Sequence, residues 1–159
     1  MPTEKRALDR TDYAILARLQ KDARLSNKEL ATKVGLAPSS CLVRVQRLTE
    51  DGVIRGAHID VDPAAVGIGL QAIIAIQLEQ HGGSGLERFK ERMLGIEEVM
   101  DVYYVGGSQD LLLHAAVRDS EHLRQVVVDK IATSDEVRHL ETAIIFEHKR
   151  SPGVPLYER

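Results

Sequence analysis

Apolar side chains recur every three or four residues through the first third of the chain, which is the spacing of amphipathic helices. Asp9 and Ser26 stand where helices need a side-chain acceptor at the N-cap, and Gly35 stands where a left-handed residue commonly ends one. The pattern therefore predicts three short helices, which cover roughly residues 9–22, 26–34 and 38–51.

The third predicted helix begins at Pro38, which suits a first helical turn because an N–H there would have no helical partner. Ala37 is a poor N-cap, so Ser39 is an alternative cap that would start the helix later. Gly52 ends the helix, and the chain is expected to continue from Val53 as a short extended segment.

The second and third helices are joined by about four residues that include glycine, which is typical of a helix-turn-helix. The second helix of such a pair enters the DNA major groove, where hydroxyl and guanidinium groups bond bases or phosphates and valine contacts a thymine methyl. The outward side of this helix supplies five candidate DNA-binding residues: Ser39, Ser40, Val43, Arg44 and Arg47. Asn27 and Lys28, beside the free amides that begin the second helix, are candidates for phosphate contacts. A bundle whose third helix is merely solvated is the alternative.

Strands alternate with helices in the rest of the chain. Apolar and β-branched runs predict strands over residues 70–79, 99–105, 111–117 and 138–149, and helical spacing predicts helices over residues 84–93 and 119–132. Residues 81–85 are expected to be a loop because they are rich in glycine. The order β-α-β-β-α-β is that of the ferredoxin-like split unit, so the sequence predicts an α+β protein with two domains.

Both helices of such a unit should cover one face of its sheet, which leaves the other face without a cover. The side chains predicted there, unless the alternate set faces outward, are Ile73, Ala75, Val102, Ala116, Ala143 and Ile145. A face this apolar is rarely left in water, so a second subunit is expected to cover it.

Proline and glycine residues mark the boundary between the two domains. The predicted division is a helix-turn-helix domain at residues 1–60, a linker at about 55–68, a ferredoxin-like domain at 69–150 and a tail at 151–159. The linker is expected to contain a short strand.

Composition narrows the class of protein. The chain has 159 residues, of which 43% are hydrophobic and 28% charged, and so carries enough apolar matter for a folded core. Its single cysteine, Cys41, excludes internal disulfides and cysteine-based zinc clusters and favours the reducing cytoplasm. No apolar run approaches the ~18 residues of a membrane span, and no secretory signal follows residues 1–6. A cytoplasmic protein without a membrane partner, metal or cofactor is expected.

Charge is unevenly distributed along the chain. Residues 1–60 contain 11 Lys/Arg and 8 Asp/Glu, a net charge of +3, whereas the remaining residues have a net charge of −6. This asymmetry indicates that the two domains have partners of different electrostatics.

Longer motifs occur in both domains. They are Leu8-Asp9-Arg10-Thr11-Asp12, Ile15-Leu16, residues 30–48 with Gly35-Leu36-Ala37-Pro38 and Cys41, Gly52-Val53-Ile54-Arg55-Gly56, and Val105-Gly106-Gly107-Ser108-Gln109-Asp110-Leu111-Leu112-Leu113. In this combination the chain resembles the Lrp/AsnC (leucine-responsive, feast/famine) family of prokaryotic transcription regulators over nearly its whole length. The resemblance implies a winged helix-turn-helix domain followed by a domain that senses an effector and forms oligomers.

The resemblance also implies an effector, typically an amino acid or similar small metabolite bound between dimers near the turn that joins the second and third strands. Carried over to this chain, the implied effector site comprises Gly107, Ser108, Gln109, Asp110, Thr133, Ser134 and Asp135. A carboxylate suits an α-ammonium group, and hydroxyls and turn amides suit an α-carboxylate. The alternative is that Gly107 and Asp110 only shape the turn.

The expected function is regulation of transcription by sequence-specific binding to double-stranded DNA, in response to an amino acid or related metabolite. Symmetric dimers that assemble into tetramers or octamers are expected to recognise an imperfect palindrome. One alternative is a small ferredoxin-like enzyme using Ser108, Asp110 and His114, but no nucleophile-elbow, phosphate-loop or metal-helix spacing supports it, so catalysis is not expected. The other is a metabolite sensor without DNA binding, against which Arg44 and Arg47 argue.

Overall fold

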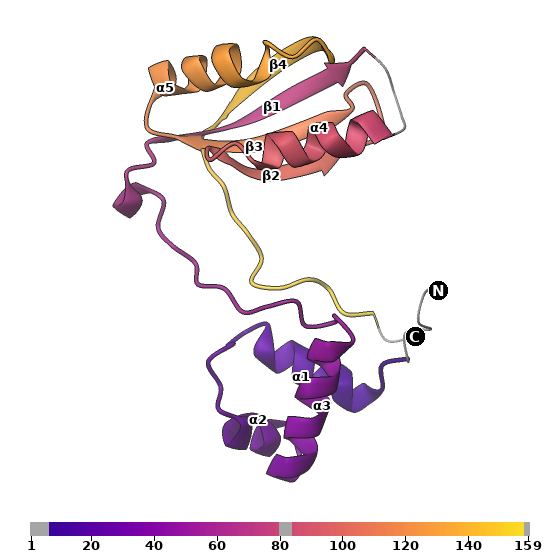
Figure 1. Ribbon diagram of the computed structural model, residues 1–159. Helices are drawn as coiled ribbons and strands as arrows, with labels where there is room; N and C mark the ends of the chain where they lie inside the picture. The colour runs from indigo at the N-terminus through magenta and orange to yellow at the C-terminus, as the bar shows by residue number, and fades with distance from the viewer. Residues whose placement is uncertain (1–6, 80–83, 158–159) are drawn as a thin grey trace. The chain divides into compact units, whose positions relative to one another are not determined.

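The computed structural model describes residues 7–79 and 84–157, which form two compact units (Figure 1). The first unit contains the described residues up to Ile59 together with the C-terminal segment from Lys149, and the second unit runs from Asp60 to His148. The C-terminal segment therefore packs with the N-terminal helices, a return of the chain that the linear pattern does not indicate. The loop predicted over residues 81–85 lies largely outside the described residues.

Three helices form the first unit: α1 (Arg10–Leu19), α2 (Asn27–Val34) and α3 (Pro38–Glu50). The predicted caps Asp9 and Ser26 are confirmed, because the side chain of each accepts the amide of the third helical residue. Gly35 has the predicted left-handed conformation, with φ +71°. The inward faces of the three helices share a core of buried side chains: Ile15, Leu30, Ala31, Cys41 and Leu48.

Ser39, in the first turn of α3, does not act as the helix cap. Pro38 occupies the first turn as predicted, and Ala37 holds the N-cap position with extended backbone and without a side-chain hydrogen bond. The alternative start at Ser39 is wrong, because the backbone at Pro38 is already helical. Ser39 is therefore not the cap, and it remains exposed.

The chain folds back immediately after α3. The amides of Val53 and Ile54 both donate to the carbonyl oxygen of Leu48, at 2.9 Å each, and their side chains pack against the helical core. The chain therefore turns back onto the helix at Val53 and Ile54, where an extended segment was predicted. The linker strand is also wrong, since residues 55–69 contain no strand and only one 3₁₀ turn, η1 (Ala64–Val66).

The second unit contains a four-stranded sheet, and helices connect some of its strands along the chain (Figure 1). Its elements are β1 (Leu70–Leu78), α4 (Ser84–Leu94), β2 (Val99–Tyr104), β3 (Leu111–Val117), α5 (Ser120–Gln125), the π-helical segment η2 (Val126–Ile131) and β4 (Val137–Ile145). All neighbouring strands are antiparallel in the order β2-β3-β1-β4. The predicted β-α-β-β-α-β unit is confirmed, although the second helix is divided because α5 continues as η2.

The core of the second unit lies between its helices and one face of the sheet. β1 contributes alternate buried residues, which are Ala72, Ile74, Ile76 and Leu78. Phe89 of α4 and Val126 of η2 pack into the same cluster, so both helical segments cover one face as predicted. β4 ends four residues earlier than predicted, and Phe146, just beyond it, is 96% exposed.

The opposite face of the sheet is free of helices in the described part of the chain. The pairing register places five of the six predicted residues there: Ile73, Ala75, Ala116, Ala143 and Ile145. The prediction for Val102 is wrong, because an irregularity between Val99 and Asp101 shifts the register of β2. Val102 therefore pairs with Leu113 and packs into the core.

Candidate functional site

The outward side of α3 divides into two stripes. One stripe is exposed and has i, i+4, i+7 spacing, and it consists of Ser39, Val43 and Gln46. We call this set the outer stripe. The neighbouring stripe contains Ser40, Arg44 and Arg47, and its two arginines are half-buried. The five predicted DNA-binding residues of α3 therefore do not form one solvent-facing set.

Arg44 and Arg47 converge on a single buried carboxylate. The Asp12 side chain is 1% exposed, with Oδ1 2.9 Å from Arg44 Nη1 and Oδ2 2.6 Å from Arg47 Nη2. Arg44 Nη1 also lies 2.6 Å from Asp9 Oδ2. Because Asp9 caps α1 and Asp12 lies in its first turn, these ion pairs hold α3 against the start of α1.

The ion pairs also set the charge state of this cluster. The hydrogen bond from Arg44 lowers the pKa of Asp9 below its ordinary value, and the amide of Asp12 adds to the effect. The same bonds to Asp9 and Asp12 raise the pKa of Arg44. Each ion pair engages one terminal nitrogen of its guanidinium, so both arginines keep donors for a second acceptor such as a phosphate.

The two candidates at the start of α2 have different environments. Asn27 Nδ2 donates to the carbonyl oxygen of Pro38 at 2.8 Å and so links the start of α2 to the start of α3. Its Oδ1 is buried without a hydrogen-bond partner in the described part of the chain. Lys28 is exposed. Asn27 therefore positions α3, whereas Lys28 faces solvent.

The second candidate site is the turn between β2 and β3. Gly107 has φ +134°, a conformation that favours glycine. The Asp110 carboxylate accepts a hydrogen bond from the amide of Leu78 at 2.8 Å, and Gln77 Nε2 donates to the carbonyl oxygen of Ser108 at 2.7 Å. Both contacts fasten the turn to the end of β1, so Asp110 shapes the turn as well as supplying charge.

Gln109 carries an acceptor that the surrounding residues do not satisfy. Its Oε1 is buried, and the described residues supply no hydrogen-bond donor to it. Buried amide oxygens are normally hydrogen-bonded, so this oxygen is an acceptor that no described residue uses. Ser108, the preceding residue, is exposed.

The predicted residues before β4 surround an arginine of α4. Ser134 Oγ accepts a hydrogen bond from Arg92 Nη2 at 2.8 Å and donates one to Glu136 at 3.0 Å. Arg92 and Glu136 also form an ion pair, which lowers the pKa of the Glu136 carboxyl. Thr133 and Asp135 are exposed.

The end of β1 brings the two predicted effector segments together. The amide of Leu78 binds the Asp110 carboxylate, and the next amide, that of Glu79, donates to the carbonyl oxygen of Glu136 at 2.9 Å. Residues 107–110 and 133–135 therefore lie at the same end of the sheet, on opposite sides of β1. Their binding of an effector stays a prediction.

Several residues at the two sites were not identified from the sequence. Gln46 had a usable signal, because it continues the helical spacing of Ser39 and Val43. Asp12 had none for its ion pairs, because 32 residues separate it from Arg44. Arg92 likewise reaches Ser134 across 42 residues, a contact that only the fold creates.

A helix-turn-helix with an exposed polar stripe, followed by a sheet domain with polar segments gathered at one end, defines a DNA-binding regulator with a separate ligand-binding domain. Comparison with known families agrees with this class. A winged helix-turn-helix DNA-binding model matches residues 8–55, and the Lrp/AsnC ligand binding domain matches residues 71–154. The chain belongs to the Lrp/AsnC family of transcription regulators.

Similar proteins have related names and structures. The HTH-type transcriptional regulator AldR of Mycolicibacterium smegmatis is 46% identical over 145 residues, which are 91% of this chain and 85% of that protein. The leucine-responsive regulatory protein of Escherichia coli K12 is 34% identical over 140 residues, 88% of this chain and 85% of that protein. A transcriptional regulator from Neisseria meningitidis, solved as a complex with L-Met, superposes with a TM-score of 0.85 at 30% identity and covers 94% of this chain and 97% of its own.

Two further properties concern only residues 7–79 and 84–157. None of the helices in these ranges has the length and apolar character needed to cross a bilayer. The same ranges contain no cluster of three or more His, Cys, Asp or Glu side chains that could bind a metal ion.

Proposed function

We propose that this regulator contacts DNA bases through the outer stripe of α3 together with Ser40. The division of α3 into an exposed stripe and an anchored stripe is the observation that carries the proposal. Glutamine, serine and valine suit adenine edges, phosphates or bases, and thymine methyls respectively, so Ser39, Val43 and Gln46 have the chemistry of base recognition.

The charged candidates act on the phosphate backbone. Arg44 and Arg47 are held by Asp12 and extend their remaining donors toward phosphates, and exposed Lys28 adds a further cation. Asn27 contributes by fixing the start of α3, next to the free amides of α2 that suit a phosphate. Phosphate contacts set register and orientation, while the outer stripe supplies sequence preference.

The effector is an amino acid or a closely related metabolite, and it binds beside residues 107–110 and 133–135. The L-Met complex of the related Neisseria meningitidis regulator supports this class of ligand. The Oε1 of Gln109, to which no described residue donates, suits an α-ammonium donor, and the Ser108 hydroxyl with the turn amides suits an α-carboxylate. Exposed Thr133 and Asp135 are positioned to contact the polar part of the ligand.

A second copy covers the open face of the sheet, and dimers assemble further into tetramers or octamers. Apolar side chains on a helix-free face favour such a partner. Several helix-turn-helix units on one assembly raise DNA affinity through effective concentration and recognise an imperfect palindrome. A ligand bound between dimers shifts the assembly only as far as it binds the two states with different affinity.

A gel-shift titration with the DNA upstream of the protein's own gene tests this function. The wild-type protein should bind that fragment more tightly than a scrambled fragment of equal length, and a thermal-shift screen of the twenty amino acids should find at least one that stabilises the protein. The amino acid that stabilises it should also change the gel shift or the elution volume. A monomer that ignores both fragments in dilute buffer would refute the proposal.

A further inference from the structure

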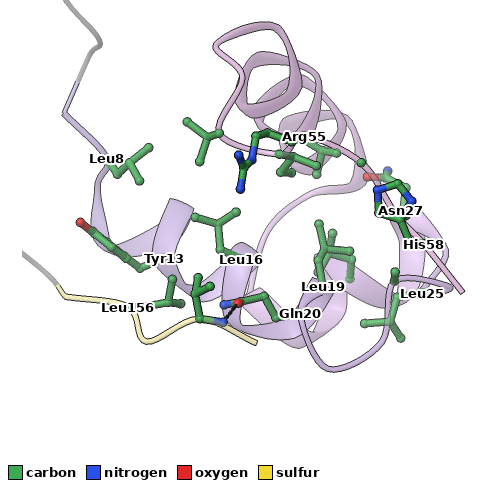
Figure 2. A pocket seen from close by; sticks show the side chains of 18 of the residues that line it. Leu8, Tyr13, Leu16, Leu19, Gln20, Leu25, Asn27, Arg55, His58 and Leu156 are labelled. Atoms are coloured by element: carbon green, nitrogen blue, oxygen red, sulfur yellow. Dashed lines mark hydrogen bonds between the residues drawn. The ribbon is translucent and has the colours of Figure 1, made fainter. Parts of the chain in front are cut away.

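The C-terminal segment is bound along α1. Tyr13 Oη donates to the carbonyl oxygen of Tyr157 at 2.9 Å, and the amide of Val154 donates to Gln20 Oε1 at 2.6 Å. Figure 2 shows Tyr13, Gln20 and Leu156 along the same edge of a pocket, with the Gln20 bond dashed. We call residues 152–157 the strap.

The strap forms one wall of an apolar cavity. The cavity has a volume of about 850 Å³ and is lined on the helix side by Leu16 and Leu19 and on the strap side by Val154 and Leu156 (Figure 2). Leu156 is half-buried by this contact. The strap is therefore held near both ends of α1 by hydrogen bonds and lines one side of the cavity with apolar side chains.

The sequence of the strap suits a fixed, extended course. Pro152 and Pro155 restrict the backbone, which lowers the entropy lost when the segment is ordered. Gly153 permits a close approach, since a Cβ there would lie 2.5 Å from Oε1 and 3.0 Å from Cβ of Gln20. Any larger residue at position 153 would therefore meet the Gln20 side chain.

The strap gives the helix-turn-helix a second connection to the sheet domain, which is non-covalent at α1. One connection is the linker at residues 55–68, and the other is the segment from the end of β4 to residue 151. β4 itself begins directly after Glu136, at the candidate effector site. A strand that starts at this site therefore ends in a segment fastened to the DNA-binding unit.

We propose that the strap is a tether that restrains the DNA-binding unit. This restraint favours the simultaneous binding of two helix-turn-helix units to one DNA site. The effect on DNA rests on the function proposed above, whereas the restraint itself does not. Releasing the strap leaves the linker as the single connection between the two units. The linker should then be cleaved faster by proteases. Release of the strap also lowers the effective concentration of the second helix-turn-helix on one DNA site.

The fit between Gly153 and Gln20 provides the test. Gly153→Ala places a methyl group against Gln20 and displaces the strap, while Gln20→Ala removes one hydrogen bond. The double variant removes Oε1 and Cδ of Gln20 and leaves only its Cβ near the methyl group, so most of the displacement should be relieved and the variant should approach Gln20→Ala. Ser151→Ala, at an exposed neighbouring position, is the matched control.

Three measurements on the full-length protein are required: hydrogen exchange of residues 150–157, the rate of tryptic cleavage at Arg55 in the linker, and affinity for the upstream DNA. Gly153→Ala should accelerate exchange and cleavage by about tenfold and weaken DNA binding by about fivefold to tenfold, with much of each effect reversed by adding Gln20→Ala. Ser151→Ala should match the wild type.

The possible results separate the two proposals. If Gly153→Ala leaves strap exchange or linker cleavage at the wild-type rate, the tether is wrong. Faster exchange and cleavage with unchanged DNA affinity would also overturn its role in binding. Faster exchange and cleavage in a protein whose wild type binds no DNA would uphold the restraint and refute the proposed function.

Discussion

Each unit of the molecule contains an arginine–carboxylate cluster, and the two clusters differ in burial. In the first unit Arg44 and Arg47 share Asp12, which is 1% exposed. In the second unit Arg92 joins Glu136, and these side chains are 51% and 43% exposed. The same chemistry therefore occurs in a dry and in a wet environment.

Burial decides what such a pair contributes to the structure. Removing one partner of a buried pair leaves an uncompensated charge, so Asp12 commits both arginines of α3 to positions set by α1. An exposed pair is typically worth about 0–1 kcal/mol, so Arg92 and Glu136 can exchange partners at little cost. The first cluster fixes the position of α3, and the second lies beside Ser134, in a segment that we propose binds the effector.

The largest expected effect follows from neutralising the buried carboxylate. Asp12→Asn keeps the shape of the side chain but removes the anion shared by Arg44 and Arg47. It should lower the free energy of unfolding of the first unit by about 3 kcal/mol, because Arg47 loses its carboxylate partner and Arg44 keeps only Asp9. Urea denaturation followed by far-UV circular dichroism measures this loss.

Glu50→Gln is the control for that experiment, because Glu50 is exposed at the end of α3. Its unfolding free energy should stay within about 0.5 kcal/mol of the wild type. A loss below about 1 kcal/mol for Asp12→Asn would show that burial does not set the value of the first cluster.

Gln46→Ala tests whether the exposed outer stripe of α3 contacts DNA. Gln46 is exposed and makes no hydrogen bond in the described part of the chain, so the change should leave the unfolding free energy intact. Affinity for the upstream DNA should fall about tenfold, within the roughly 1–3 kcal/mol of one good base contact. Arg47→Ala should instead reduce stability and DNA affinity together, because Arg47 also binds Asp12.

Fluorescence anisotropy with a labelled fragment distinguishes these variants. Gln125→Ala, a glutamine substitution on α5, serves as the control and should bind DNA like the wild type. If Gln46→Ala also binds like the wild type, the outer stripe is not the surface that contacts bases.

The exposed cluster predicts a smaller change in stability. Arg92→Met should cost less than about 1 kcal/mol of unfolding free energy, because the pair with Glu136 is solvated. It should weaken binding of a stabilising amino acid severalfold, since Ser134 loses the donor that orients its loop. Calorimetric titration and urea denaturation give the two values, and a stability loss above about 2 kcal/mol would break the contrast between the clusters.

Local chemistry predicted much of the fold. Caps at Asp9 and Ser26, the left-handed Gly35 and the strand at residues 111–117 depend on neighbours in sequence, and the structure confirms them. The errors arose where the tertiary register or turn chemistry decided the outcome. Val102 faces the core because of an irregularity in β2.

The candidate sites were harder to predict than the elements that carry them. Helical spacing assigned Arg44 to the outward side of α3, but its hydrogen bonds to Asp9 and Asp12 depend on how α1 packs. The placement of residues 133–135 and Asp110 at the same end of the sheet likewise depends on β3 and β4 both pairing with β1. Sequence spacing predicts which face of a helix or strand a side chain occupies. It does not predict which residue of another element that side chain contacts.

Acid titration provides the smallest and most specific test of the exposed cluster. Arg92 lowers the folded-state pKa of Glu136 below the ordinary glutamate value of about 4.3, so its contribution to stability is fully present above that pH. The contribution is lost as the pH falls through the folded value, because protonation removes the charge that Arg92 binds. The stability gap between wild type and Arg92→Met should therefore be constant from pH 7 to about pH 5.5 and narrow toward pH 3.5. A gap that persists unchanged at pH 3.5 would show that Arg92 stabilises the loop through packing or through Ser134 rather than through the charge of Glu136.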